Sequence, residues 1–339
     1  MKALLKNVMM VVLLSALGMS QAYATDSAAT AMTPSVFDQF NQTQVLKVEL
    51  SLDMEALHAN KKSNEYQKAK FSIIGDSNIE TYSVKVRARG RFRRVKSEMP
   101  PLKLKFSKKE LIAQGLSEDN DYKLVTHFYD SREGDDAVLR EYLAYKLYNE
   151  LSGQSFRVQL AEVTYKDKNT KEKTTRFGIL IEDADQMASR LGGDICDECF
   201  NRPEADYDAT NLQLHALFQY MIGNTDWSVM MNRNLKVVKV NKTGKYIAVP
   251  YDFDFSGFVN ATYAIPNVDY KLTTVRDRAF LGSQNLPKAL MAAKGMMIAK
   301  RAAMENTINE FKLMSRKSRK DLIEYMDSFY TALETQQEL

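Results

Sequence analysis

Five oxygen-bearing side chains stand on either side of a short hairpin pattern in the second half of the chain. They are Asp226, Asn232, Asn234, Asp252 and Asp254. The hairpin pattern consists of two apolar-alternating runs around Asn241-Lys-Thr-Gly244, which is a typical tight-turn sequence. Carboxylate and amide oxygens are the hard ligands that Mg²⁺ prefers in proteins. We therefore expect the two loops at one end of this hairpin to bind a divalent cation together with a nucleotide.

The order acid, amide, hairpin, acid is the order in which a kinase-type site presents its catalytic and metal-binding residues. In this interpretation Asp226 orients or deprotonates the attacking hydroxyl, and Asn234 (or Asn232) and Asp252 hold the metal. Asp254 would be a second metal ligand, because a strand over 251–255 places it on the same face as Asp252. Two buried carboxylates on one face need a cation to balance them. The structural alternative is that these residues only form turns and helix caps.

Basic residues in the first half of the chain could bind phosphate groups. Lys103 and Lys105 lie two positions apart, so they share one face of the predicted strand 102–106. One of them could hold the phosphates and pair with a helix glutamate, for which Glu141 is the nearest in kinase order. Arg89, in the alternating run 82–89, could clamp a phosphate bidentately. The alternative for each is a solvated basic strand face.

The first 24 residues have the features of a secretory signal. Lys2 and Lys6 precede an apolar run, and Ala22-Tyr-Ala24 fits the small-x-small cleavage pattern. We expect export to the periplasm or the extracellular space after cleavage near Ala24, with no membrane-spanning segment in the mature chain. Removing Lys2 and Lys6 lowers the formal charge from +4 to +2, which argues against nucleic acid as the main partner.

The two cysteines of the chain form the short motif Cys196-Asp-Glu-Cys199. In an exported protein a local disulfide is the leading interpretation. A redox site and a metal site remain alternatives, although a metal site would need two more ligands. The histidines His58, His127 and His215 are scattered, and the chain contains no HExxH, serine-triad or P-loop motif, which disfavours a zinc hydrolase.

Hydrophobic periodicity predicts a β-rich first half and a mainly helical second half. Strands are expected at 45–52, 68–74, 82–89, 102–106, 122–128, 158–165 and 176–181, and helices at 138–151, 183–191, 208–222 and from 287 onward. The pattern indicates an α+β arrangement with two lobes. The expected division is a signal peptide at 1–24, a tail at 25–42, a β-rich lobe at 43–182 and a mainly helical lobe at 183–339.

Several segments, taken in order, resemble the spore coat protein H (CotH) family of atypical protein kinases. The segments are VRARGRFRR (86–94), PLKLKF (101–106), LREYLAYKLYNEL (139–151), RFGILIE (176–182), GNTDW (223–227) and PYDFDFSG (250–257). The resemblance covers roughly residues 80–260, and it implies a bilobal protein-kinase-like fold. The N-lobe would be an antiparallel sheet plus a helix, and the mainly helical C-lobe would carry the catalytic hairpin. It also implies nucleotide contacts from Arg89, Lys103 or Lys105, Glu141 and Glu182.

The chain departs from the family pattern where the phosphates would be covered. Arg91-Phe-Arg stands in place of the family's Asn-Ser-Ser, and Met99-Pro-Pro in place of its Pro-Lys-Lys. The leading hypothesis is an exported kinase that transfers a phosphoryl group from ATP, with Mg²⁺ or Mn²⁺, to a hydroxyl of a protein or small molecule, and an envelope acceptor is one expected partner. The alternatives are an inactive kinase-like binding protein at the cell envelope and a metal-dependent nucleotide-sugar transferase that uses Asp252-x-Asp254.

Overall fold

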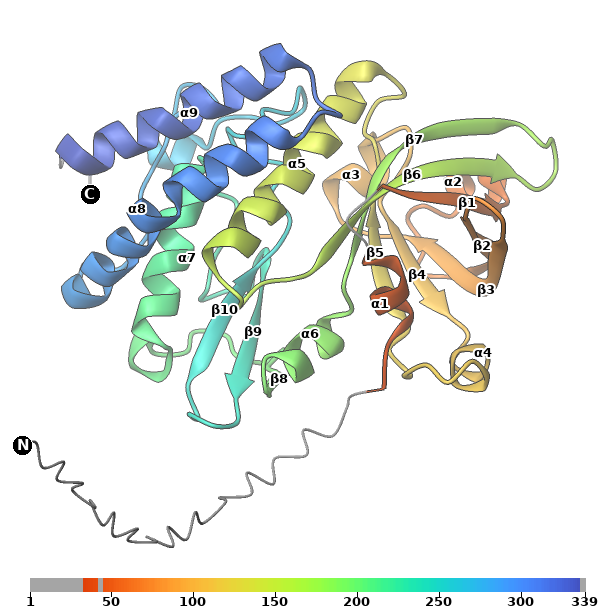
Figure 1. The fold of residues 1–339 in the computed structure, drawn as a ribbon, viewed down its shortest axis with the longest axis horizontal. Helices are drawn as coiled ribbons and strands as arrows, with labels where there is room; N and C mark the ends of the chain where they lie inside the picture. Colours follow the sequence, from red (N-terminus) through yellow and green to blue (C-terminus); the bar gives the residue numbers. More distant parts are fainter. Residues whose placement is uncertain (1–32, 42–44, 336–339) are drawn as a thin grey trace, which may run out of the picture. The chain divides into compact units, whose positions relative to one another are not determined.

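A computed structural model describes residues 33–41 and 45–335 of the chain (Figure 1). The chain divides into two units, Met1–Thr33 and Pro34–Leu339, and the second unit contains the fold. The predicted signal segment 1–24 lies outside the described residues. The predicted tail 25–42 is described from residue 33, and its last part contains the helix α1 (Val36–Phe40).

Seven strands of the second unit form a closed barrel in the order β1-β2-β3-β4-β5-β7-β6 (Figure 1). Their bounds are β1 Leu46–Leu52, β2 Gln67–Ile74, β3 Ile79–Ala88, β4 Leu102–Phe106, β5 Asp121–Val125, β6 Val158–Asp167 and β7 Lys173–Ile181. All neighbouring strands are antiparallel except β1 and β6, which pair in parallel from Leu46 opposite Ala161 to Leu52 opposite Asp167. This parallel pair closes the barrel.

The interior of the barrel is filled by the apolar residue at every second position of the strands. Helix α1 adds two aromatic rings to this core. The ring of Phe40 lies 5.5 Å from that of Phe71 and 5.9 Å from that of Phe106, and the ring of Phe37 stacks 5.8 Å from that of Tyr122. A capping box between Ser35 and Asp38 starts the helix at Val36.

Long helices pack beside the barrel and against one another. They are α5 (Arg132–Leu151), α7 (Ala209–Met221), α8 (Pro287–Glu310) and α9 (Arg316–Thr335). A small antiparallel sheet of β8 (Gly193–Ile195), β9 (Leu235–Val240) and β10 (Tyr246–Pro250) accompanies them, in the order β10-β9-β8. The shorter helices are α2 (Met54–Ala59), α3 (Phe92–Lys96), α4 (Lys108–Ala113) and α6 (Ala184–Arg190), with 3₁₀ turns at Glu204–Asp206 and Val268–Tyr270.

One apolar core joins the barrel to the helices. Ile179 and Ile181 of β7 belong to the same buried cluster as Leu147 of α5 and Phe218 of α7. The end of β7 is therefore buried on both faces, which explains why its last four residues do not alternate between buried and exposed. Among the helices in the described ranges, none combines the length and the apolar character needed to cross a membrane.

The expected bilobal, protein-kinase-like fold, with an antiparallel sheet and a helix as its N-lobe, is wrong. The strands form a closed mixed barrel with its own interior core, and residues of β5, β6 and β7 pack against the helices in a second core. The alternating patterns located the strands, but they carry no information about closure. Closure depends on the pairing of β1 with β6, two segments that are far apart in the sequence.

Candidate functional site

A cleft of about 590 Å³ lies between the start of α3 and the loops that flank the β9–β10 hairpin. Its lining includes six residues that the sequence singled out, which are Arg89, Asp226, Asn232, Asn234, Asp252 and Asp254. The expected arrangement of loop, hairpin and loop is confirmed, and it brings Asp226 and Asp252 to one cleft.

Two glycines hold the ends of this segment together. The amide of Gly257 donates to the carbonyl of Gly223 (3.1 Å), and Gly223 has a φ of +63°. A side chain at either position would collide with the hydroxyl group of Tyr325, which belongs to α9. The close approach leaves no room for a side chain at Gly223 or at Gly257. The left-handed backbone at Gly223 is a second reason for glycine at that position.

Local hydrogen bonds fix the loop that carries Asp226. The backbone amide of Asp226 donates to Oδ1 of Asn224 (2.9 Å), and the indole of Trp227 donates to the carbonyl of Asn224 (3.1 Å). The side-chain amide of Asn234 donates to Oδ2 of Asp226 (2.9 Å), and Arg233 lies 3.5 Å from Oδ1. Burial raises the pKa of Asp226, the charge of Asp252 raises it further, and Arg233 and Asn234 oppose the rise.

Asp252 follows β10 in a left-handed conformation, with φ of +69°. The expectation that 251–255 continues as a strand is wrong, because β10 ends at Pro250. The hydroxyl of Tyr145 accepts the backbone amide of Asp252 (2.8 Å) and helps to hold this turn. Asn232 and Asn234 also have positive φ values, so three non-glycine residues of one cleft adopt a costly backbone conformation.

A buried cation lies beneath the carboxylates. Arg93 is 3.7 Å from Asp254 and 3.7 Å from Glu141 of α5, and all three residues are buried. Asp254 also accepts a hydrogen bond from the hydroxyl of Tyr263 (2.9 Å). Burial and then the charge of Asp252 raise the pKa of Asp254 to about 7, and burial also raises the pKa of Glu141. The expected pairing of Glu141 with Lys103 or Lys105 is therefore wrong, since Arg93 takes that place.

Lys123 of β5 is a cation near the cleft that the sequence reasoning missed. Its ammonium lies 5.0 Å from the ring centre of Tyr251 and 5.4 Å from that of Phe156. Burial lowers the pKa of Lys123 to about 7, and the positive charge of Arg89 contributes to the decrease. Among the described residues, neither Lys123 nor Arg89 has a carboxylate within ion-pair distance. Lys123 lies directly opposite Lys103 on the neighbouring strand, so the two lysines share one face of the sheet. The pairing of these strands therefore identifies Lys123 as a further candidate for binding phosphate.

Three predicted nucleotide-binding residues lie outside the cleft. Lys103 forms an ion pair with Asp121 (2.8 Å), and Lys105 lines a different groove on the outer face of the barrel. Glu182 is fully buried and pairs with Arg157 (2.7 Å) and Arg190 (2.8 Å). Glu182 thus joins β6 to α6, and its carboxylate has no access to the cleft.

Within the described chain, the cleft contains no metal site made of protein ligands alone. Over 33–41 and 45–335, no three Asp, Glu, His or Cys side chains lie close enough together to hold a metal by themselves. Asp254 is engaged by Arg93 and Tyr263, so Asp252, Asp226 and Asn234 offer the more accessible oxygens. Mg²⁺ commonly binds through one or two carboxylates plus substrate phosphates and water.

The disulfide predicted between Cys196 and Cys199 is present, with Cα atoms 5.5 Å apart. The loop that it closes contacts the cleft segment. The carbonyl of Asp197 accepts from the side chain of Asn232 (3.3 Å), and the amide of Asn201 donates to the carbonyl of Met230 (2.9 Å). The disulfide loop therefore supports the turn that carries Asn232.

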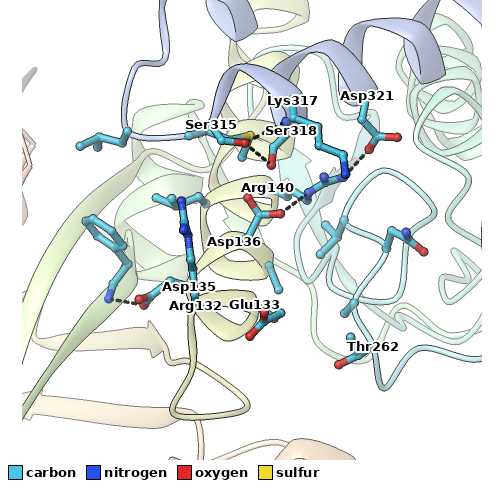
Figure 2. A pocket seen from close by; sticks show the side chains of 18 of the residues that line it. Arg132, Glu133, Asp135, Asp136, Arg140, Thr262, Ser315, Lys317, Ser318 and Asp321 are labelled. Carbon is cyan, nitrogen blue, oxygen red and sulfur yellow. Dashed lines mark hydrogen bonds and ion pairs between the residues drawn. The ribbon is translucent and has the colours of Figure 1, made fainter.

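A second polar cavity of about 760 Å³ lies between the start of α5 and the start of α9 (Figure 2). Arg140 crosses it, pairing with Asp136 (2.7 Å) and with Asp321 of α9 (2.7 Å). The other oxygen of Asp321 pairs with Arg276 (2.7 Å). Because these charges neutralise one another, we interpret this cavity as a structural junction.

No protein-family model matches this chain, and no curated protein sequence matches it. The resemblance to the CotH family therefore stays a hypothesis, and the functional argument depends on the cleft itself.

Proposed function

We propose that the cleft binds a nucleoside triphosphate with Mg²⁺ or Mn²⁺ and transfers its terminal phosphoryl group to a hydroxyl of a protein or small molecule. One observation carries the proposal. The carboxylates and amides of the hairpin loops share the cleft with Arg89, and Lys123 lies beside it, although neither cation has a carboxylate partner in the described chain. Facing groups of acidic oxygens and unpaired cations are suited to a phosphate chain that carries a metal ion.

Asp226 is the proposed catalytic residue. Its side chain is 43% exposed, so an acceptor hydroxyl can reach it, and its raised pKa makes its carboxylate a stronger base. The hydrogen bond from Asn234 fixes the orientation of the carboxylate. As the acceptor oxygen bonds to the terminal phosphorus and the bond to the leaving diphosphate breaks, Asp226 takes the hydroxyl proton.

The remaining groups position the donor. Arg89 and Lys123 would bind phosphate oxygens, and the half-exposed ring of Phe92 offers a stacking surface for the base. Asp252, with Asn234, would hold the divalent ion, which neutralises phosphate charge when bound. The backbone at Asp252 is already left-handed in the fold, and the residue lines the cleft. Binding of a metal ion there would therefore need no further change of the backbone.

A binding protein without catalysis is the second candidate. It is favoured by Arg93, whose guanidinium lies between the carboxylates of Asp254 and Glu141 and balances part of their charge. For either function we propose export, which agrees with the Cys196–Cys199 disulfide, since disulfides persist in oxidising compartments.

The test combines thermal melting with Mn-ATP and phosphate incorporation into the protein or an envelope extract. Asp252→Asn should abolish the stabilisation by Mn-ATP, whereas Asp226→Asn should keep it and lower transfer by about 10²-fold or more. Asp194→Asn, on an exposed position of β8, is the charge-matched control and should behave like wild type. Stabilisation without incorporation in wild type would favour the binding protein. A wild-type protein that shows neither stabilisation nor incorporation would reject the kinase and leave the binding protein.

A further inference from the structure

A groove of about 770 Å³ on the outer face of the barrel is lined mainly by residues of β2, β3 and β4 and the start of α4. Figure 1 shows these three strands side by side in the barrel. Its lining contains six lysines, which are Lys68, Lys70, Lys85, Lys105, Lys108 and Lys168. Three serines also line it, and none of the described lining residues is acidic. This concentration is local, because the formal charge of the whole chain is only +4.

Three of these lysines lie directly opposite one another. Lys68 of β2 pairs with Lys85 of β3, and Lys85 pairs with Lys105 of β4. All three side chains are exposed and point to the same outer face. Neighbouring strands lie about 4.8 Å apart, and like charges directly opposite destabilise a sheet. The row Lys68–Lys85–Lys105 therefore places like charges side by side on the sheet, and an acidic residue, Asp121 of β5, lies opposite only the last of them.

The usual structural reasons for such lysines do not apply here. Lysines often protect the edge of a sheet from pairing with other chains, but these strands lie inside a closed barrel. Across the described part of the chain, Lys68, Lys70, Lys85 and Lys105 have no carboxylate within ion-pair distance. The two lysines at the rim are paired, Lys108 with Glu118 (2.9 Å) and Lys168 with Asp53 (3.3 Å).

We propose that this groove binds a polymer of closely spaced phosphate groups. The row Lys68–Lys85–Lys105 supplies cations at intervals of a few ångströms, and Lys70 adds a fourth. The hydroxyl groups of Ser51, Ser83 and Ser107 supply hydrogen-bond donors to phosphate oxygens. Lysine ammonium groups bind phosphate as point charges, so they tolerate variation along a flexible chain.

The composition of the groove favours this ligand over other polyanions. Single-stranded nucleic acids are usually held by exposed aromatic rings that stack on the bases. The only aromatic lining residue in the described chain is Phe106, which is buried in the barrel. The repeating phosphate could belong to inorganic polyphosphate or to a glycerol-phosphate polymer of an envelope, and the two sources can be separated by experiment.

The experiment measures binding of the mature chain to inorganic polyphosphate and, separately, to a poly(glycerol phosphate) chain over a series of salt concentrations. The variant is Lys68→Gln/Lys85→Gln/Lys105→Gln. Its control is Lys242→Gln/Lys288→Gln/Lys300→Gln, which removes the same charge from exposed positions elsewhere. Thermal melting verifies that both variants fold.

We expect the groove variant to weaken binding by about tenfold or more and to reduce the salt slope of log K by about two to three. The control should change neither quantity by a comparable amount. Tighter binding of one polymer would identify the source of the phosphate. Absence of binding to both polymers, equal weakening in both variants, or equally tight binding of polyglutamate or of a single-stranded oligonucleotide of equal charge would overturn the proposal.

Discussion

The side-chain amide of Asn234 donates a hydrogen bond to the carboxylate of Asp226, with 2.9 Å between Nδ2 and Oδ2. The bond joins the start of the loop before β9 to the residue that directly precedes this strand, and it fixes the direction of the proposed base. Asn234 has φ of +55°, a conformation that asparagine tolerates better than most residues. One residue thus supplies both a backbone turn and a side-chain contact.

These two roles of Asn234 can be separated by substitution. Asn234→Gly and Asn234→Ala both remove the amide, but only glycine accepts the left-handed backbone without cost. The Ala variant should therefore be less stable than the Gly variant by about 1 kcal/mol in urea unfolding. Both variants should lose transfer activity to a similar extent. Equal stability of the two would show that the turn relaxes when the amide is absent.

The pKa of Asp254, which is about 7 in the fold, predicts a pH dependence of stability. Between about pH 4 and pH 7 the unfolded chain releases this proton while the folded chain retains it, so stability falls as pH rises through this window. The decrease should be at most about 4 kcal/mol, since one pKa unit corresponds to about 1.4 kcal/mol. Asp254→Asn keeps an acceptor for Tyr263 and should flatten the curve of melting midpoint against pH. The control Asp194→Asn should keep the wild-type slope.

Lys123 predicts a pH dependence of anion binding. Its pKa of about 7 means that the free site loses this charge as pH rises from 6 to 8, so affinity for a triphosphate should fall over this range. The phosphate groups of the ligand also titrate near neutral pH, and this changes affinity independently of the protein. The pH dependence of binding to Lys123→Met measures this contribution of the ligand alone. We expect this variant to weaken binding at pH 6 by about tenfold. Lys103→Met, on the same face but paired with Asp121, should retain both affinity and pH dependence.

Arg140 should contribute to stability independently of any activity. Its largely buried side chain pairs with Asp136 of its own helix, α5, and with Asp321 of α9, and the second pair joins the two helices (Figure 2). Arg140→Met leaves both carboxylates without this partner and should lower the free energy of unfolding by about 1–3 kcal/mol. Arg132→Met removes an exposed arginine of the same cavity and should change the free energy of unfolding by less than about 0.5 kcal/mol. Equal effects would show that the network contributes nothing specific.

Local patterns predicted the elements of this protein well. The alternating run 82–89 corresponds to β3, Asp208 caps α7, and Pro287 begins α8. The hairpin turn at 241–244 joins β9 to β10 and brings the two acidic loops together. Each of these features depends on residues that are neighbours in the sequence, so their signal is present in the sequence itself.

Features that depend on distant pairing could not be predicted in this way. The closure of the barrel by β1 and β6 has no local signature. The choice among Lys103, Lys105 and Lys123 depended on which neighbours each strand acquires. Lys103 acquires Asp121 as a partner, Lys105 lies in the outer groove, and Lys123 is left beside Arg89 and Tyr251. Likewise, Arg93 replaces a lysine as the partner of Glu141 because α3 places it beneath the cleft.

The disulfide loop should affect the cleft more than the fold. Replacing Cys196 and Cys199 by serine releases a loop so short that it restricts the unfolded chain little, so the loss of stability should be small, about 1–2 kcal/mol. The same change removes the covalent constraint on Asp197, which lies between the two cysteines. The carbonyl of Asp197 accepts a hydrogen bond from Asn232, and its carboxylate pairs with Lys236 (2.5 Å). We therefore expect Mn-ATP affinity to fall by a few-fold while the melting midpoint of the free protein changes little. Lys236→Met, with the disulfide intact, removes only the ion pair and should have a smaller effect on affinity. A large loss of stability with unchanged nucleotide affinity would instead make the disulfide a purely structural link.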